Sequence, residues 1–172
     1  MHNENDEPRS FAVSVGSRSF EYTLPGGALA TFTWPASGAL DDDLAPVDIT
    51  GATAAATSAA TDAPLAVDGD ASTRWSSGQA QAPGQNVTVD LGHAKRFSRV
   101  AVDSGGSLGD YARNWQLETS DDGTNWTIRA SGTGSAQLTT IDVPSTKARY
   151  LRISSTGDAG NWWSIADVRL YN

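Results

Sequence analysis

The sequence predicts an all-β fold, a sandwich or a barrel, from three observations. From about Val47 onward, apolar and polar residues alternate over short segments, as in strands with one buried face. Turns rich in Gly and Asp separate these segments at roughly regular intervals. No segment shows a convincing helical period, and no repeat has the spacing of a solenoid.

The alternation indicates where the strands lie. Val87, Val89 and Leu91 alternate in the first clear strand, at 86–92. Trp115 and Trp126 each begin a later strand and alternate with apolar residues, so both are expected in the core. The other expected strands are 97–104, 138–143, 149–155 and 165–172.

The chain before this region predicts a separate organisation. Residues 1–10 are polar and are expected to be disordered, or to mark a cut through a longer chain. Residues 11–35 resemble strands around a Pro25-Gly26-Gly27 turn and end near Trp34, but so few strands cannot easily bury a core alone. Residues 36–46 are predicted to be a linker, and residues 47–172 the main domain.

Composition excludes several classes of partner. The 172 residues include no cysteine and carry a net charge of −8. This charge disfavours nucleic acid and anionic membranes as partners. No apolar run approaches the roughly 20 residues of a membrane span. Abundant Ala, Gly, Ser and Thr suit a secreted, extracellular bacterial module.

The segment AVDGDASTRWSS, residues 66–77, concentrates hard oxygen donors in one loop. Asp68, Asp70 and Thr73 can converge if the chain curls at Gly69, and such donors are those that Ca²⁺ prefers. The EF-hand template fails, so a calcium site here requires ligands from elsewhere in the chain. The alternative is an ordinary Asx turn.

Catalytic arrangements are disfavoured. Glycosidase carboxylates usually flank a cleft from different elements, whereas Asp68 and Asp70 share one tight loop, as do Asp121 and Asp122. His93 is expected to be solvated, and no nucleophile motif or phosphate-binding loop occurs.

Two segments predict a ligand site. Trp162 and Trp163 follow a flexible polar turn, and neighbouring residues that enter a strand point to opposite faces. At least one indole is therefore expected at the surface, where it could stack on a sugar ring. The loop at 109–114 offers hydrogen-bonding groups on four residues, Asp110, Tyr111, Arg113 and Asn114.

These segments, in this order, resemble the coagulation-factor type C (discoidin-like) domain, and especially family 32 carbohydrate-binding modules. The resemblance covers 47–172 and rests on AVDGDASTRWSS, NVTVDLG, DYARNWQLETSDDGTNW, ARYLRISSTG and NWWSIADVRLY. It implies a jelly-roll β-sandwich of about five strands against three. Residues 11–34 are similar to the last strands of the β-domain in family 30 glycoside hydrolases.

The resemblance also implies site residues. A structural calcium ion would be held by the Leu65 carbonyl, Asp68, Asp70, Thr73, the Ala166 carbonyl and Asp167. The ligand site would comprise Arg113 and Asn114, with Asp110 and Tyr111 nearby. Trp162 and Trp163 complete the ligand site, with Trp162 preferred for stacking and Trp163 for partial burial.

The expected function is therefore that of a non-catalytic module that holds a secreted bacterial glycoside hydrolase on its polysaccharide. The expected partners are a polysaccharide or oligosaccharide and the catalytic domain of the parent enzyme. Two alternatives stay open: a protein-binding discoidin-type adhesion domain, and a purely structural accessory domain of the enzyme.

Overall fold

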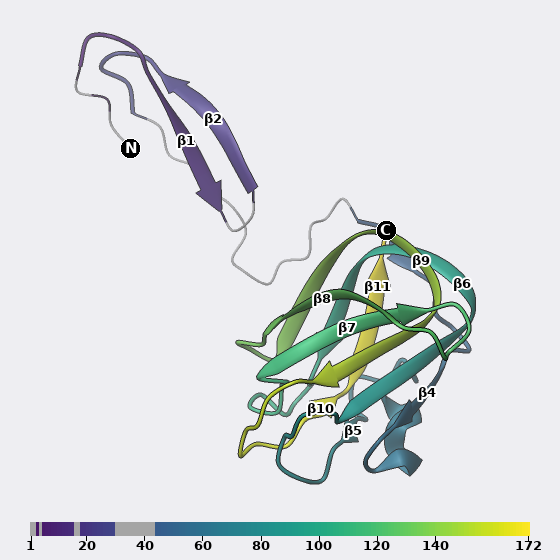
Figure 1. Ribbon diagram of the computed structural model, residues 1–172. Coiled ribbons are helices and arrows are strands. Elements are labelled where there is room, and N and C mark those ends of the chain that lie inside the picture. The colour runs from purple at the N-terminus through teal and green to yellow at the C-terminus, as the bar shows by residue number, and fades with distance from the viewer. Residues whose placement is uncertain (1–2, 4, 16–17, 30–43) are drawn as a thin grey trace. The chain divides into compact units, whose positions relative to one another are not determined.

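The computed structural model describes residues 3, 5–15, 18–29 and 44–172, and the chain divides into two compact units, residues 1–39 and 40–172. In the first unit, β1 (Arg9–Val15) and β2 (Arg18–Leu24) form an antiparallel hairpin (Figure 1). Phe11 and Tyr22 are cross-strand partners whose ring centroids lie 5.9 Å apart. Trp34 and the residues just before it, 30–33, lie outside the described residues.

The structure describes residues 3 and 5–10 of the segment that was expected to be disordered or to mark a cut through a longer chain. Asn3 is buried, and its side-chain amide donates to the carbonyls of Glu7, Leu24 and Pro25 at 2.9–3.2 Å. Strand β1 already begins at Arg9.

The second unit is an antiparallel β-sandwich, which confirms the predicted fold class. Two long strands, β6 (Asn86–Asp103) and β9 (Leu138–Ser155), pass through both layers. Their register shifts at 90/95 and 97/99, where the pairing changes from one layer to the other. Figure 1 shows both strands running the length of the unit.

The layers follow from the strand pairing. Among the described residues, one layer has five segments: β4 (Thr53–Ala56), the start of β6, the end of β9, β7 (Asn114–Ser120) and β8 (Thr127–Thr133). The other layer has β11 (Asp167–Tyr171), the end of β6 and the start of β9, with the two-residue β3 (Pro46–Val47) at its edge. The predicted five strands against three are thus found, with β3 in addition.

Short elements cover one end of the sandwich. Strands β5 (Trp75–Ser76) and β10 (Ser164–Ile165) pair antiparallel, and a 3-10 helix, η1 (Ala60–Ala66), precedes β5. These strands lie at the opposite end of the unit from the C-terminus (Figure 1). No described helix is long and apolar enough to cross a membrane.

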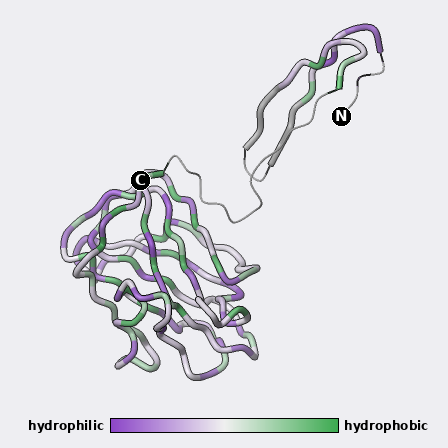
Figure 2. Tube along the Cα trace, turned by 180° about the vertical axis from the view of Figure 1, so that it is seen from behind, coloured by the Kyte–Doolittle hydropathy of each residue, from purple (hydrophilic) through white to green (hydrophobic). Residues whose placement is uncertain are grey.

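The core lies between the two layers. Val87 and Val89 from one layer and Val100 from the other are fully buried in one hydrophobic cluster, and Trp115, as predicted, is 8% exposed. Trp75 is also buried. Figure 2 shows hydrophobic and hydrophilic residues alternating along the strands of this unit, as period-two burial requires.

The prediction that Trp126 lies in the core is wrong. A bulge shifts the β7–β8 register, so that Leu117 pairs with Ala130 but Glu118 pairs with Ile128. One extra residue reverses the faces of the side chains beyond it. Ile128 is consequently 62% exposed, and Trp126 is partly exposed.

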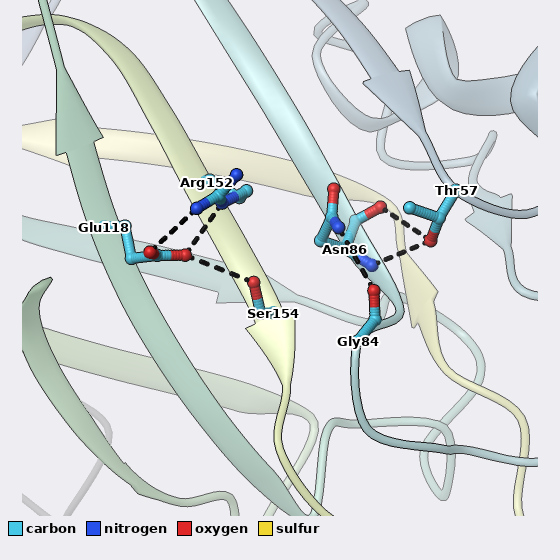
Figure 3. Close-up of polar contacts among 6 residues, drawn as sticks. All are labelled: Thr57, Gly84, Asn86, Glu118, Arg152 and Ser154. Carbon is cyan, nitrogen blue, oxygen red and sulfur yellow. Dashed lines mark hydrogen bonds and ion pairs between the residues drawn. The ribbon is translucent and has the colours of Figure 1, made fainter. Parts of the chain in front are cut away.

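The outer face of the five-stranded layer carries paired charges. Arg152 donates two hydrogen bonds of 2.7 and 2.8 Å to Glu118, and Ser154 lies 3.5 Å from the same carboxylate (Figure 3). The Arg152 guanidinium also lies 4.2 Å from the centroid of the Trp126 ring. These contacts make Trp126 part of a surface network.

Candidate ligand-binding and calcium loops

The predicted ligand residues lie in two loops that meet near β5 and β10. The first loop connects β6 to β7, and the second connects β9 to β10. A Cβ atom on Gly109 of the first loop would lie 3.7 Å from Asn161 Nδ2 of the second. Segments about fifty residues apart in the chain are thus neighbours, as the ligand-site prediction requires.

Arg113 and Tyr111 form a compact pair in the first loop. The Arg113 guanidinium lies 3.8 Å from the centroid of the Tyr111 ring. It donates one hydrogen bond to the Tyr111 carbonyl at 3.0 Å and another to the Gly109 carbonyl at 2.9 Å. Arginine has five N–H donors, so these two bonds fix the side chain and leave donors for a ligand.

Asp110 and Asn114 connect the first loop to its surroundings. The Asp110 carbonyl accepts the Ser164 N–H at 2.8 Å, and its carboxylate lies 3.3 Å from the Ser164 hydroxyl. The Asn114 carbonyl accepts the Thr156 N–H at 3.0 Å. A Cβ atom on Gly157 would lie 2.4 Å from Asn114 Nδ2, so the Asn114 amide packs closely under the second loop.

The two adjacent tryptophans have opposite environments. Trp162 is 51% exposed, so its indole is available at the surface. Trp163 is 1% exposed, and its ring packs edge-to-face on Trp75 at 5.2 Å. Including Trp163 among the ligand-binding residues was therefore wrong, because a side chain enclosed by the core cannot touch a ligand at the surface.

Sequence reasoning missed Gln81, a residue whose side chain bonds both loops. Its side chain is buried and bonds to Tyr111, Arg113 and Trp162. A glutamine in the polar run before β6 gives no signal of burial, because only the fold brings three distant backbone groups around it. The sequence offers no pattern that could have identified it.

The acidic loop is an Asx-type turn with several internal hydrogen bonds. Asp68 accepts the Asp70 N–H at 2.9 Å and the Thr73 hydroxyl at 2.7 Å. Asp70 accepts the hydroxyl and the N–H of Ser72 at 2.6 and 2.9 Å, and these bonds lower the pKa of Asp70. The loop is therefore organised by its own side chains.

Asp167 lies in a more buried and crowded environment. Burial raises the pKa of Asp167; the nearby Asp103 and Asp68 carboxylates also raise it, while Arg169 opposes them. The Arg169 guanidinium bonds Asp103 at 2.9 Å and lies 3.3 Å from Asp167. Asp103 and Asp167 are direct cross-strand partners, so Arg169 partly neutralises two opposed carboxylates.

The acidic loop predicted to bind calcium lies beside the last strands, and Asp68 is close enough to Asp167 to raise its pKa. Gly105 contacts both the acidic loop and the segment before the last strand. A Cβ atom added at Gly105 would lie 2.7 Å from the Ala166 Cβ and 3.5 Å from the carbonyl oxygen of Ala71 in the acidic loop. Within the described ranges, however, no group of three or more His, Cys, Asp or Glu side chains is arranged to hold a metal. The hard oxygen donors fit Ca²⁺ chemically. A site would depend on the carbonyls of Leu65 and Ala166 as well as on Asp68, Asp70, Thr73 and Asp167.

Comparison with known proteins identifies the family. The model of the F5/8 type C domain matches residues 49–168. A solved family 32 carbohydrate-binding module of Clostridium perfringens NanJ, in complex with galactose, is 24% identical, with a TM-score of 0.66, and the match covers 75% of this chain and 99% of that one.

Two further solved structures are more similar in sequence. The family 32 module of AlyQ, in complex with 4,5-unsaturated mannuronic acid, is 32% identical (TM-score 0.59; 74% of this chain and 98% of that one). Chitosan-binding module 2 of a Paenibacillus sp. IK-5 chitosanase/glucanase, in complex with chitotriose, is 30% identical (TM-score 0.60; 70% and 95%). No curated protein matches. Since the family model matches more than half of the chain, this protein belongs to the F5/8 type C (discoidin-like) domain family, and its structural neighbours are family 32 carbohydrate-binding modules.

Proposed function

We propose that residues 47–172 form a non-catalytic carbohydrate-binding module that binds a polysaccharide through Trp162 and the neighbouring loop at 109–114. The observation that carries the proposal is the half-exposed Trp162 indole in a loop that adjoins Gly109. An exposed aromatic face stacks on the apolar face of a sugar ring. Arg113 and the Asp110 carboxylate supply hydrogen-bonding groups for sugar hydroxyls nearby.

A site of this size binds weakly. One stacked ring and two or three hydrogen bonds correspond to a dissociation constant near the millimolar range, about −4 kcal/mol. Linkage to a catalytic domain raises the effective concentration and makes such binding useful. We therefore include in the proposal that this module is linked to a glycoside hydrolase secreted by a bacterium.

Affinity gel electrophoresis through soluble polysaccharides tests the proposal. The panel should include galactan, chitosan and alginate, because similar modules bind galactose, chitotriose and an unsaturated mannuronic acid. We expect one glycan to retard this protein and Trp162→Ala to abolish the retardation at an unchanged melting temperature. Trp126→Ala is the matched control, since Trp126 is partly exposed on the outer face of the five-stranded layer, and it should be retarded like the wild type.

Other outcomes would redirect the assignment. If no glycan retards the protein, the protein-binding or structural alternatives gain support. If Trp162→Ala binds normally while Trp126→Ala does not, the site lies on the sheet instead of the loops.

We also propose that a structural Ca²⁺ ion joins the loop at 65–73 to the last strands through Asp68, Asp70, Thr73 and Asp167. Binding to the native state alone adds stability by mass action, about 2.7 kcal/mol at a hundredfold excess over the dissociation constant. EDTA should lower the melting temperature, and Ca²⁺ should restore it. Asp68→Asn should remove this Ca²⁺ response, whereas Asp121→Asn, in the distant β7–β8 turn, should keep it. If the melting temperature of the wild type changes neither with EDTA nor with Ca²⁺, the proposed calcium site is refuted.

A further inference from the structure

Gln81 is a buried residue whose backbone holds the second ligand loop. It is 2% exposed and forms an isolated antiparallel bridge with Ala159. Its N–H points to the carbonyls of Ala159 and Asn161 at 2.9 and 3.0 Å, and its carbonyl accepts the Ala159 N–H at 3.1 Å. The backbone at this position therefore determines where the residues just before Trp162 lie.

The side chain of Gln81 connects both loops at once. Its Nε2 donates to the Tyr111 carbonyl at 2.9 Å and to the Trp162 carbonyl at 3.0 Å. Its Oε1 accepts the Arg113 N–H at 2.9 Å. The two N–H donors and the oxygen acceptor of the Gln81 amide therefore all bond to backbone groups of residues that are predicted to contact the ligand. Because the amide is buried, water cannot readily replace these bonds.

We propose that Gln81 is a positioning residue that fixes the Trp162 indole relative to the Arg113 guanidinium. The inference rests on the proposed function of the two loops and adds a residue that does not itself contact the sugar. A ring stacked on Trp162 can use the donors of Arg113 only if the two loops keep one spacing. A single amide that bonds both loops fixes this spacing before binding. Sugar binding then costs less conformational entropy, because the loops are already ordered.

Gln85 provides a matched control. It is also a buried glutamine, at 6% exposure, but within the described part of the chain its side chain bonds only to its own turn. Its Nε2 donates to the Ala80 carbonyl at 3.0 Å, and its Oε1 accepts the Ala82 N–H at 3.2 Å. Replacing either glutamine by glutamate keeps the shape of the side chain but replaces its NH₂ donor group with a carboxylate oxygen, which only accepts hydrogen bonds. Both substitutions should destabilise the fold, but only the change at Gln81 removes bonds to the ligand loops.

The test compares Gln81→Glu with Gln85→Glu, using the glycan that retards the wild type, well below the melting temperature of each variant. We expect Gln81→Glu to lose affinity by about tenfold or more, because carboxylate and carbonyl oxygens would face one another at both loops. Gln85→Glu should keep its affinity within about twofold while its melting temperature falls. Protonation of the new carboxyl restores one donor, so affinity in Gln81→Glu should partly recover as the pH falls from about 7 to about 5.

Amide hydrogen exchange without glycan tests the coupling independently of binding. Exchange in Gln81→Glu should accelerate in both loops, 109–113 and 157–163, whereas Gln85→Glu should leave them unchanged. Unchanged exchange in either loop, wild-type affinity in Gln81→Glu, or an equal loss of affinity in Gln85→Glu would overturn the inference. If the wild type binds no glycan, the proposed function fails, and the exchange result still decides whether Gln81 couples the loops.

Discussion

The adjacent residues Trp162 and Trp163 provide the sharpest stability test. Trp163 is 1% exposed and packs edge-to-face on Trp75, whereas Trp162 is 51% exposed. A buried tryptophan removes roughly 150–250 Å² from water, which at about 25 cal/mol per Å² corresponds to about 4–6 kcal/mol as an upper range. Measured truncations of buried aromatic residues cost about 3–5 kcal/mol. We therefore expect Trp163→Ala to lower the free energy of unfolding by about 4 kcal/mol.

Trp162→Ala should change that free energy by no more than about 0.5 kcal/mol, as surface substitutions usually do. The assay is urea denaturation of both variants, followed by far-UV circular dichroism, with thermal denaturation in parallel. For a unit of this size, the loss in Trp163→Ala corresponds to a melting temperature lower by roughly 15 °C. Near-UV circular dichroism should lose the signal of the Trp75–Trp163 pair. Equal destabilisation by the two substitutions, or a larger effect at Trp162, would refute the assignment of the two faces.

Two further predictions concern charges on the second unit. Arg152→Ala should lower the free energy of unfolding by about 2 kcal/mol in urea denaturation, because Glu118, whose side chain is only 12% exposed, loses two charge-assisted bonds. Arg149→Ala is the control and should cost less, since the Arg149–Asp90 pair is more exposed; equal losses would contradict this reasoning. Hydrogen bonds from Asn125, Thr124 and Ser120 hold the pKa of Asp122 in the folded protein well below its usual value. The ionised Asp122 carboxylate therefore stabilises the fold above its unfolded pKa of about 3.9. This stabilisation is lost as the pH falls from that value toward the lower pKa of the folded state. Asp122→Asn should therefore lower the melting temperature at neutral pH, with a difference from the wild type that narrows below about pH 4; a constant difference would show that the charge is not responsible.

The alternating residues of the sequence were enough to predict an all-β fold, a sandwich or a barrel, and the resemblance to the type C domain selected the sandwich. Val87, Val89 and Trp115 lie in the core as their alternation indicated, because period-two burial is a local property of a strand. The same local rule failed at Trp126, since the bulge opposite Leu117 and Glu118 depends on how β7 and β8 pair. Strand identity could thus be inferred from the chain, but one unpredicted bulge decided which face a tryptophan occupies.

The candidate site divides in the same way. The sequence by itself determined that one of two adjacent tryptophans faces out, and that polar groups gather at 109–114. The resemblance favoured Trp162 for stacking, but only the tertiary structure decided that Trp162 is exposed and that Trp163 completes the core on Trp75. It alone showed that the Gln81 side chain joins the two loops. The physical reason is that burial and long-range hydrogen bonds depend on segments distant in the chain, whereas sequence patterns report only neighbouring residues.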